Sequence, residues 1–379
     1  GFYYVGIFML DEDGEWAVLQ TGTGDIGEKL LRMGHRLRVD DNSMVGWCIG
    51  HDAPRIAQDV TQDPLYFDNP LLPDAQSAIA LPLKSRGQVN GALTIQSDRR
   101  FAFTQEDIDS VIEVLQSDFL TQGPQVPAFE TAISEYCGVE YTLAVNSGTS
   151  ALHIACLALG IGTGDEVWTS PITFVASANC ARYCGASVDF VDIDPRTYNM
   201  SVEALAEKLQ QRKNAGGTLP SLVIPVHLCG QSCDMAAIRA LGDEYGFRIV
   251  EDASHALGGR YQDGPIGDCR YSDMAVFSFH PVKIITTAEG GAVTTNSAEL
   301  AEKLALFRSH GVTRDEPLMT RPSHGPWYYE QIELGYNYRM SNVLAGIDRG
   351  QLKTIEPGVQ GRREIFNYFE QEDISQEDK

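Results

Sequence analysis

The chain has 379 residues, of which 43% are hydrophobic, and a formal net charge of −23 from 29 basic and 52 acidic residues. This length predicts two or three domains, and the acidic balance excludes surfaces for nucleic acid or anionic membranes, which need clustered lysine and arginine. No apolar run approaches the roughly 20 residues that span a bilayer. Its eight cysteines lack the CxxC spacing of common structural zinc sites. We therefore expect a cytoplasmic protein with reduced cysteines and no metal.

The first hundred residues carry an α+β pattern. Short apolar runs separated by turn residues predict strands, and Ser43 is a suitable N-cap for a short helix. The expected strands are 4–10, 16–20, 78–83 and 89–96, and the expected helix is 43–51.

This segment resembles a GAF domain. The resemblance is carried by Met44-Val45-Gly46-Trp47, by Asp63-Pro64-Leu65-Tyr66-Phe67, by Ala80-Leu81-Pro82-Leu83 and by Gly91-Ala92-Leu93-Thr94-Ile95-Gln96-Ser97. It implies a partial α+β GAF domain over residues 1–103, a module that senses small molecules or mediates dimerisation. Next, Thr104-Gln105-Glu106-Asp107 has the spacing of a capping box and predicts a helix to about Ser117.

From residue 110 onward short strands alternate with helices. This alternation predicts an α/β fold with a mostly parallel sheet wrapped by helices, and ligands bind such sheets at the carboxyl ends of their strands. The expected strands are 142–145, 166–169, 188–192, 222–226, 248–251 and 274–277, and the expected helices are 150–160, 173–184, 201–213 and 234–246.

Lys283 stands in a loop of small residues between two apolar runs, 274–277 and 292–295. A lysine on a tight connection between two buried strands can lose its proton in a water-poor site and act as an amine nucleophile toward an aldehyde cofactor. Alone, the same pattern also fits a solvated turn lysine.

Three further signals follow strands of the same predicted sheet. Asn146-Ser147-Gly148-Thr149-Ser150-Ala151-Leu152 opens a helix and offers backbone amides and hydroxyls to a phosphate, or simply caps that helix. Asp252 at a strand end could hold a protonated pyridine nitrogen or cap a helix. Phe174 could stack on a cofactor ring or fill the core. Together with Lys283 they are the parts that pyridoxal 5′-phosphate (PLP) needs.

Residues 110–367 resemble the DegT/DnrJ/EryC1/StrS family of nucleotide-sugar aminotransferases, which have the type I PLP-dependent aminotransferase fold. The motifs are closest to the 4-aminotransferases of pseudaminic acid biosynthesis. They are Ser117-Asp118-Phe119-Leu120-Thr121-Gln122-Gly123-Pro124, Ser170-Pro171-Ile172-Thr173-Phe174-Val175-Ala176-Ser177-Ala178-Asn179 and Phe277-Ser278-Phe279-His280-Pro281-Val282-Lys283.

The resemblance assigns expected roles to single residues. Lys283 matches the catalytic lysine that carries PLP, Asp252 the pyridinium partner and Phe174 the stacking ring. The remaining matches are cofactor contacts: Thr149, Ser150 and Ser278 to the phosphate, His255 beside Asp252, and Asn337 to the phosphate in the partner subunit of a homodimer. The implied reaction is amino transfer from L-glutamate to a UDP-linked 4-keto-6-deoxy-N-acetylhexosamine.

The chain also departs from the family pattern. The GAF segment replaces the family's first residues, and the chain ends before the smaller C-terminal domain, so that residues 104–379 are expected to form a C-terminally truncated aminotransferase domain. One alternative is a GAF-type sensor fused to an inactive scaffold, and another is a fragment or fusion without joint function. PMP-dependent 3-dehydration is disfavoured, because family members with that chemistry carry histidine where this chain has Lys283.

Overall fold

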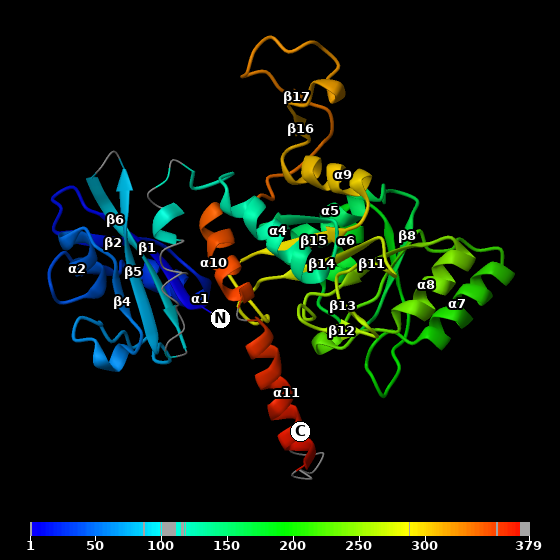
Figure 1. Ribbon diagram of the computed structural model, residues 1–379, viewed down its shortest axis with the longest axis horizontal. Coiled ribbons are helices and arrows are strands. Elements are labelled where there is room, and N and C mark those ends of the chain that lie inside the picture. Colours follow the sequence, from blue (N-terminus) through cyan, green and yellow to red (C-terminus); the bar gives the residue numbers. More distant parts are fainter. Residues whose placement is uncertain are drawn as a thin grey trace. The chain divides into compact units, whose positions relative to one another are not determined.

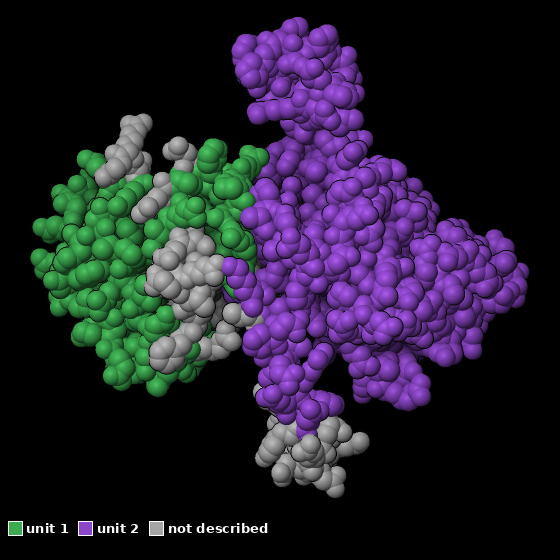
Figure 2. Space-filling view, in the orientation of Figure 1, with its two compact units in different colours: residues 1–125, 285–288, 342–350 green, residues 126–284, 289–341, 351–379 purple. Residues whose placement is uncertain are grey.

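The computed structural model describes residues 2–371 except 86–87, 99, 101–110, 115–116, 118, 288 and 354. Its contacts divide the chain into two compact units (Figure 2). Unit 1 contains residues 1–125, 285–288 and 342–350, and unit 2 contains residues 126–284, 289–341 and 351–379. The predicted boundary at residue 103 stays a prediction. No helix in the described ranges is long and apolar enough to cross a bilayer.

Unit 1 is built on a six-stranded antiparallel sheet in the order β3-β2-β1-β6-β5-β4 (Figure 1). Its strands are β1 Phe2–Leu10, β2 Trp16–Gly22, β3 Arg36–Arg38, β4 Arg55–Ala57, β5 Ser77–Ser85 and β6 Gln88–Ser97. The helices are α1 Gly24–Arg32 and α2 Met44–His51, with a 3-10 turn at Val60–Gln62. The expected N-cap is confirmed, because the side chain of Ser43 accepts a hydrogen bond from the Gly46 amide.

Both faces of this sheet are covered, which explains why β5 is apolar without a polar alternation. Ala78 and Ala80 pack in a core with α2, whereas Ile79 and Leu81 face a second cluster. Because side chains alternate along a strand, these pairs belong to opposite faces. The second cluster includes Ile347 of α10 (Asn342–Lys353). The expected capping box at 104–107 lies outside the described residues, while residues 111–114 are helical.

Unit 2 contains a seven-stranded sheet in the order β7-β15-β14-β11-β10-β8-β9. Its strands are β7 Tyr141–Val145, β8 Glu166–Thr169, β9 Ser187–Phe190, β10 Leu222–Ile224, β11 Arg248–Asp252, β14 Met274–Ser278 and β15 Gly291–Thr295. Only β15 runs against its neighbours, β14 and β7. The expected mostly parallel α/β sheet is therefore confirmed, and each expected strand is present within two residues at either end.

Helices lie along both faces of this sheet (Figure 1). They are α4 Gln125–Cys137, α5 Gly148–Ala158, α6 Ala176–Tyr183, α7 Val202–Asn214, α8 Met235–Tyr245 and α9 Ala298–Arg308. Helix α11 Ile355–Gln371 extends away from the sheet (Figure 1). Short elements complete the unit: β12 Arg260–Tyr261, β13 Gly264–Pro265, β16 Val312–Thr313, β17 Glu330–Gln331 and 3-10 turns at Leu228–Gly230 and Glu316–Leu318.

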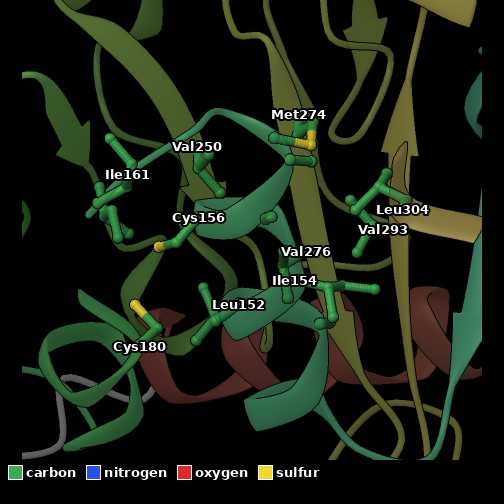
Figure 3. Packing of buried hydrophobic residues seen from close by; sticks show 14 of the residues in the cluster. Leu152, Ile154, Cys156, Ile161, Cys180, Val250, Met274, Val276, Val293 and Leu304 are labelled. Carbon is green, nitrogen blue, oxygen red and sulfur yellow. The ribbon is translucent and has the colours of Figure 1, made fainter. Parts of the chain in front are cut away.

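Helix α5 runs through the centre of unit 2 and is buried nearly all round. Its Leu152 and Ile154 pack with Val276 and Val293 of the sheet in the main core of the unit (Figure 3). A helix that is apolar on every side is typical of a core position between a sheet and other helices. The amino end of α5 is thereby fixed at the carboxyl edge of the sheet, where the expected phosphate cradle lies.

Candidate active site

A cavity of about 250 Å³ opens at the carboxyl ends of the parallel strands of unit 2. This volume is near the lower end of the range for small-molecule pockets, about 300 Å³. Six of the eight expected site residues line it together, and several unpredicted polar residues join them. The lining consists of Ser147, Gly148, Thr149, Leu152, Thr173, Phe174, Ala176, Val226, His227, Leu228, Asp252, Ser254, His255, Ser278, His280, Val282, Lys283 and Glu289.

Lys283 lies in the turn that follows β14, as expected, and its side chain is partly buried. Its backbone N–H donates to the carbonyl of His280 at 2.8 Å, which closes the turn. Burial lowers the pKa of the Lys283 ammonium, and the nearby charge of Asp252 opposes that shift. The structure therefore places a partly desolvated amine inside a cavity, as a nucleophilic lysine requires.

Asp252 ends β11 and is 4% exposed. One carboxylate oxygen accepts a 2.6 Å hydrogen bond from the Ser177 hydroxyl, and the other accepts from the hydroxyl and amide of Ser254 at 2.6 and 3.2 Å. No α-helix follows Asp252, so the helix-capping alternative does not apply. A buried carboxylate held from both sides and facing a cavity is suited to a cationic N–H partner.

The amino end of α5 packs closely against β14. A Cβ atom added at Gly148 would lie 2.8 Å from Cβ of Ser278, so only glycine allows this approach. Ser147 is the N-cap, and its hydroxyl accepts from the Ser150 amide at 3.0 Å. The hydroxyls of Ser147 and Thr149 and the first amides of α5 are thus gathered beside Ser278, as a phosphate site needs.

Phe174 and His255 complete the cavity wall. Phe174 is 72% exposed, so the alternative that it fills the core is wrong for this chain. Burial and then the charge of Lys283 lower the pKa of His255, while Asp252 opposes the shift. Lys283, Asp252 and His255 are therefore close enough to influence one another, although they are up to 31 positions apart in the chain.

Two expected contacts do not line the cavity. Ser150 is buried, and its hydroxyl donates to the side-chain oxygen of Asn146 at 2.7 Å. Asn337 is exposed and pairs through a backbone bridge with Ser309. The structure thus places Ser150 behind the cradle and Asn337 outside its own chain's cavity.

The sequence alone did not identify a buried histidine beside the site. His227 follows β10, and its Nδ1 accepts from the Cys233 amide at 3.2 Å, so Nε2 carries the hydrogen and donates to Glu251 at 2.7 Å. The Ser272 hydroxyl donates to the other oxygen of Glu251 at 2.5 Å. The position of His227 after a strand could have marked it as a candidate, as it did for Asp252. Its pairing with Glu251 could not be predicted, because it depends on β10 and β11 being neighbours in the sheet.

These residues fit pyridoxal 5′-phosphate. The amine of Lys283 and the carboxylate of Asp252 face one cavity, and the start of α5 brings its first amides and the Thr149 hydroxyl to the rim. The close approach at Gly148 would be lost with any larger residue, which indicates a cradle built at this point. Among the described residues, no three His, Cys, Asp or Glu side chains form a metal-binding group.

Unit 1 has a smaller cavity of about 40 Å³. Its volume leaves room for only a few water molecules. Apolar side chains dominate the lining, with Tyr4, Phe8, Leu30, Met44, Tyr66 and Leu72 among them. The buried Tyr4 hydroxyl has no hydrogen-bond partner among the residues that the structure describes, and burial raises the pKa of Tyr4 to about 12.

Comparisons with known proteins agree with this geometry. The model of the DegT/DnrJ/EryC1/StrS aminotransferase family matches residues 102–374, and that of the GAF domain matches residues 1–116. A UDP-4-amino-4,6-dideoxy-N-acetyl-beta-L-altrosamine transaminase from Campylobacter jejuni is 39% identical, over 71% of this chain and 67% of its own length. GDP-perosamine synthase from Caulobacter vibrioides is 38% identical over 69% of this chain and 66% of its own length.

Solved structures give the same result. PseC of Helicobacter pylori, an aminotransferase involved in the biosynthesis of pseudoaminic acid, aligns with a TM-score of 0.60 at 34% identity, covering 67% of this chain and 64% of PseC. A protein from Streptococcus pneumoniae in its PLP form aligns with a TM-score of 0.61 at 28% identity, covering 71% of this chain and 69% of that one. The chain therefore belongs to the DegT/DnrJ/EryC1/StrS aminotransferase family and carries a GAF domain at its amino-terminal end.

Proposed function

We propose that the chain is a PLP-dependent nucleotide-sugar 4-aminotransferase. The observation that carries this proposal is the single cavity shared by the amine of Lys283, the buried carboxylate of Asp252 and the amino end of α5. The same cavity holds the exposed ring of Phe174. A solvated turn lysine would not share a cavity with a doubly hydrogen-bonded buried carboxylate.

The chain's residues would divide the work as follows. PLP, when bound, supplies an aldehyde that exchanges amines and a protonated ring that withdraws electrons from the reacting carbon. Asp252 would hold the proton on the ring nitrogen, and Ser177 and Ser254 keep its two oxygens in place. Lys283 accepts and returns a proton at Nζ, since its lowered pKa makes the neutral amine available. Thr149 and the first amides of α5 hold the phosphate.

The proposed substrate is a UDP-linked 4-keto-6-deoxy-N-acetylhexosamine, with L-glutamate as amino donor. The Campylobacter relative is named as a transaminase of a UDP-linked 4-amino-4,6-dideoxy-N-acetyl sugar, which supports the choice. The Caulobacter relative is named for a GDP sugar, so the nucleotide should be varied in the assay. Product formation from the UDP sugar, with matching conversion of glutamate to 2-oxoglutarate, is the expected result. Turnover of a GDP sugar alone would contradict the nucleotide assignment.

Cofactor attachment tests the reaction class directly. The full chain is mixed with PLP, reduced with borohydride and digested, and the modified peptide is identified by mass spectrometry. We expect the label on Lys283 and its loss in Lys283→Ala. Lys303 is a suitable control, since it is paired with Glu299 on the surface of α9 and Lys303→Ala should leave the labelling unchanged. Labelling spread over surface lysines would contradict the site.

We further propose a homodimer in which Asn337 reaches the partner's site. Asn337 is exposed and away from its own cavity, although the resemblance gives it a phosphate contact. The rim of the cavity also leaves large apolar groups in solvent, with Phe174 72%, Val175 60% and Val282 75% exposed. Exposed apolar groups around a site are typical of surfaces that a second subunit covers.

A mixing experiment tests the shared site. Lys283→Ala and Asn337→Ala chains, each inactive, are combined under conditions that allow subunits to exchange. Some mixed dimers then contain one intact site, so activity should return to at most about a quarter of wild type if exchange is random. If both variants dimerise and exchange yet no activity returns, the shared site is refuted while the reaction class stands.

A second candidate function is small-molecule sensing by unit 1. Its cavity and the unpartnered hydroxyl of Tyr4 favour it, but about 40 Å³ is too small for a nucleotide without opening of the cavity. Calorimetry of the full chain with cyclic nucleotides and small metabolites, beside the transamination assay, separates the two functions. Ligand binding that Tyr4→Phe weakens, with no turnover of any keto sugar, would favour sensing.

A further inference from the structure

A row of hydrogen bonds runs from the wall of the cofactor cavity to the buried carboxylate of Asp252. Thr173 lines the cavity, and its Oγ1 lies 2.7 Å from Oγ of Ser177, four positions later in the chain. Ser177 is fully buried, and its hydroxyl donates to Oδ2 of Asp252 at 2.6 Å. The row thus joins a side chain of the cavity wall to the carboxylate proposed to hold the ring nitrogen of PLP.

The direction of these hydrogen bonds follows from the number of hydrogens. The Ser177 hydroxyl has one hydrogen and two acceptors within reach, Asp252 at 2.6 Å and the Phe174 carbonyl oxygen at 3.2 Å. The short bond to a carboxylate is the stronger one, so the hydrogen points to Asp252. The Ser177 oxygen is then the acceptor, and the Thr173 hydroxyl donates to it. Because hydrogen bonds in a row polarise one another, Thr173 strengthens the bond from Ser177 to the carboxylate.

The two oxygens of Asp252 are held unequally. An ionised carboxylate offers about four acceptor positions, two on each oxygen. Oδ1 accepts from both the amide and the hydroxyl of Ser254, at 3.2 and 2.6 Å, so both of its positions are filled. Within the described part of the chain, Oδ2 accepts from the Ser177 hydroxyl alone. One acceptor position of the carboxylate is therefore open, and it is on Oδ2.

We propose that Oδ2 of Asp252 receives the N–H of the PLP ring, and that Ser177, supported by Thr173, is the positioning residue that aims this oxygen. Ser177 decides where the open position points, because its own hydrogen bond occupies the other position of Oδ2. Ser254 has the complementary task, since it fills Oδ1 and removes it as an alternative acceptor. The inference rests on the proposed PLP site and adds to it the receiving atom and the hydroxyls that orient it.

Two substitutions separate the oxygens of the carboxylate. Ser177→Ala deletes a 2.6 Å hydrogen bond to Oδ2, so that this oxygen is no longer aimed from behind. Ser254→Ala deletes a hydroxyl bond of the same length to Oδ1, while the Ser254 amide still donates to that oxygen. Both changes remove one hydroxyl from the same buried carboxylate, and they differ in the oxygen that they release.

The experiment compares two ligands that differ at one ring atom. They are PLP and its analogue with a C–H group in place of the ring nitrogen, which keeps the aldehyde and the phosphate. Fluorescence titration of the full apo-protein gives the affinity for each ligand. The ratio of the two affinities isolates the contribution of the ring N–H, because a change that merely loosens the site lowers both affinities and leaves their ratio unchanged.

We expect the wild-type chain to bind PLP about 10- to 100-fold more tightly than the analogue, as one hydrogen bond between charged groups allows. Ser177→Ala should reduce this ratio by about tenfold, and Ser254→Ala by less than about threefold. Thr173→Val should reduce it by about twofold, because it removes only the support of the next bond, and Thr173→Ser should restore it. Thr131→Val is the matched control, since the Thr131 hydroxyl donates to the Pro127 carbonyl on α4, outside the cavity lining.

The outcomes separate this inference from the proposed function. Failure of the wild-type chain to bind PLP would contradict both. An equal affinity of the wild-type chain for the two ligands, an unchanged ratio in Ser177→Ala, or a larger loss in Ser254→Ala than in Ser177→Ala would overturn the inference alone. If circular dichroism shows that the buried Ser177→Ala does not fold, Thr173→Val decides, since Thr173 is only partly buried. An unchanged ratio in Thr173→Val would then overturn the inference.

Discussion

Gly148→Ala is the sharpest test of how the cradle is built, because one methyl group is added where the start of α5 packs against the end of β14. The new Cβ would lie 2.8 Å from Cβ and 3.1 Å from Oγ of Ser278. Carbon atoms in contact prefer about 3.5–4.0 Å. A hydroxyl could rotate away, but Cβ of Ser278 is fixed to the backbone of β14, so the helix end or the strand end must move.

The expected cost follows from this overlap. Overpacking a close contact by one methyl group costs about 1–3 kcal/mol in the free energy of unfolding. The movement also displaces the first amides of α5 from the phosphate position. We therefore expect the affinity for PLP to fall by about tenfold, which corresponds to about 1.4 kcal/mol. Both effects arise from the same displacement, so they should occur together.

Urea unfolding of the apo-protein and fluorescence titration with PLP measure the two quantities. Gly358→Ala in α11 is the control, since its added Cβ would meet nothing within 4 Å in the described part of the chain beyond its own helical surroundings. It should be neutral or stabilising by up to about 1 kcal/mol. The double variant Gly148→Ala with Ser278→Gly removes the overlap, so its loss of stability should be smaller than the sum of the single losses. Additive losses, or equal stability of Gly148→Ala and Gly358→Ala, would refute the reasoning.

Three further outcomes are expected. Asp252→Asn removes the negative charge that opposes the effect of burial on Lys283, so the pKa of Lys283 should fall further. The pH midpoint for trapping an aldehyde on Lys283 with borohydride should then move to lower pH, and a move to higher pH would contradict this reasoning. At Gly311, φ is +66° and an added Cβ would lie 1.9 Å from a backbone carbonyl oxygen. Gly311→Ala should therefore lower the free energy of unfolding in urea by about 2–4 kcal/mol, and a decrease below about 0.5 kcal/mol would contradict this. Glu130→Ala removes the partly buried carboxylate that pairs with Arg308. It should lower the free energy of unfolding by about 1.5–3 kcal/mol in the same assay, and an unchanged urea midpoint would show that the pair does not stabilise the fold.

The location of the residues that follow strands could be predicted from the sequence, because the direction of a strand alone decides at which edge of the sheet its last residue lies. Asp252 follows an apolar run, and Lys283 follows another, so a parallel sheet brings both to one edge. Thr149 follows a strand in the same way, whereas Ser278 was expected from the resemblance alone; both line the cavity. The argument from strand direction needed only the alternation of strands and helices, without knowledge of the strand order.

Residues whose role depends on register or helix phase could not be predicted in the same way. Ser177 donates to Asp252 across 75 positions, a contact that requires the packing of α6 against the sheet. His227 meets Glu251 only because β10 and β11 are neighbours. Ser150, one position after Thr149, does not line the cavity. Each step along a helix turns the side chain by about 100°, and this phase could not be predicted from the sequence.

The direction of β15 explains why the lysine and the phosphate cradle lie at the same edge of the sheet. Because β15 runs against β14, the connection that carries Lys283 starts and ends at the carboxyl edge of the sheet. The amino end of α5 rests on both strands: an added Cβ at Gly148 would meet Ser278 at the end of β14, and one at Gly291 would lie 2.5 Å from the backbone of Ser147. A shift of either strand would therefore move the cradle with it. Backbone packing thereby ties the phosphate position to the two strands between which the lysine-bearing connection runs.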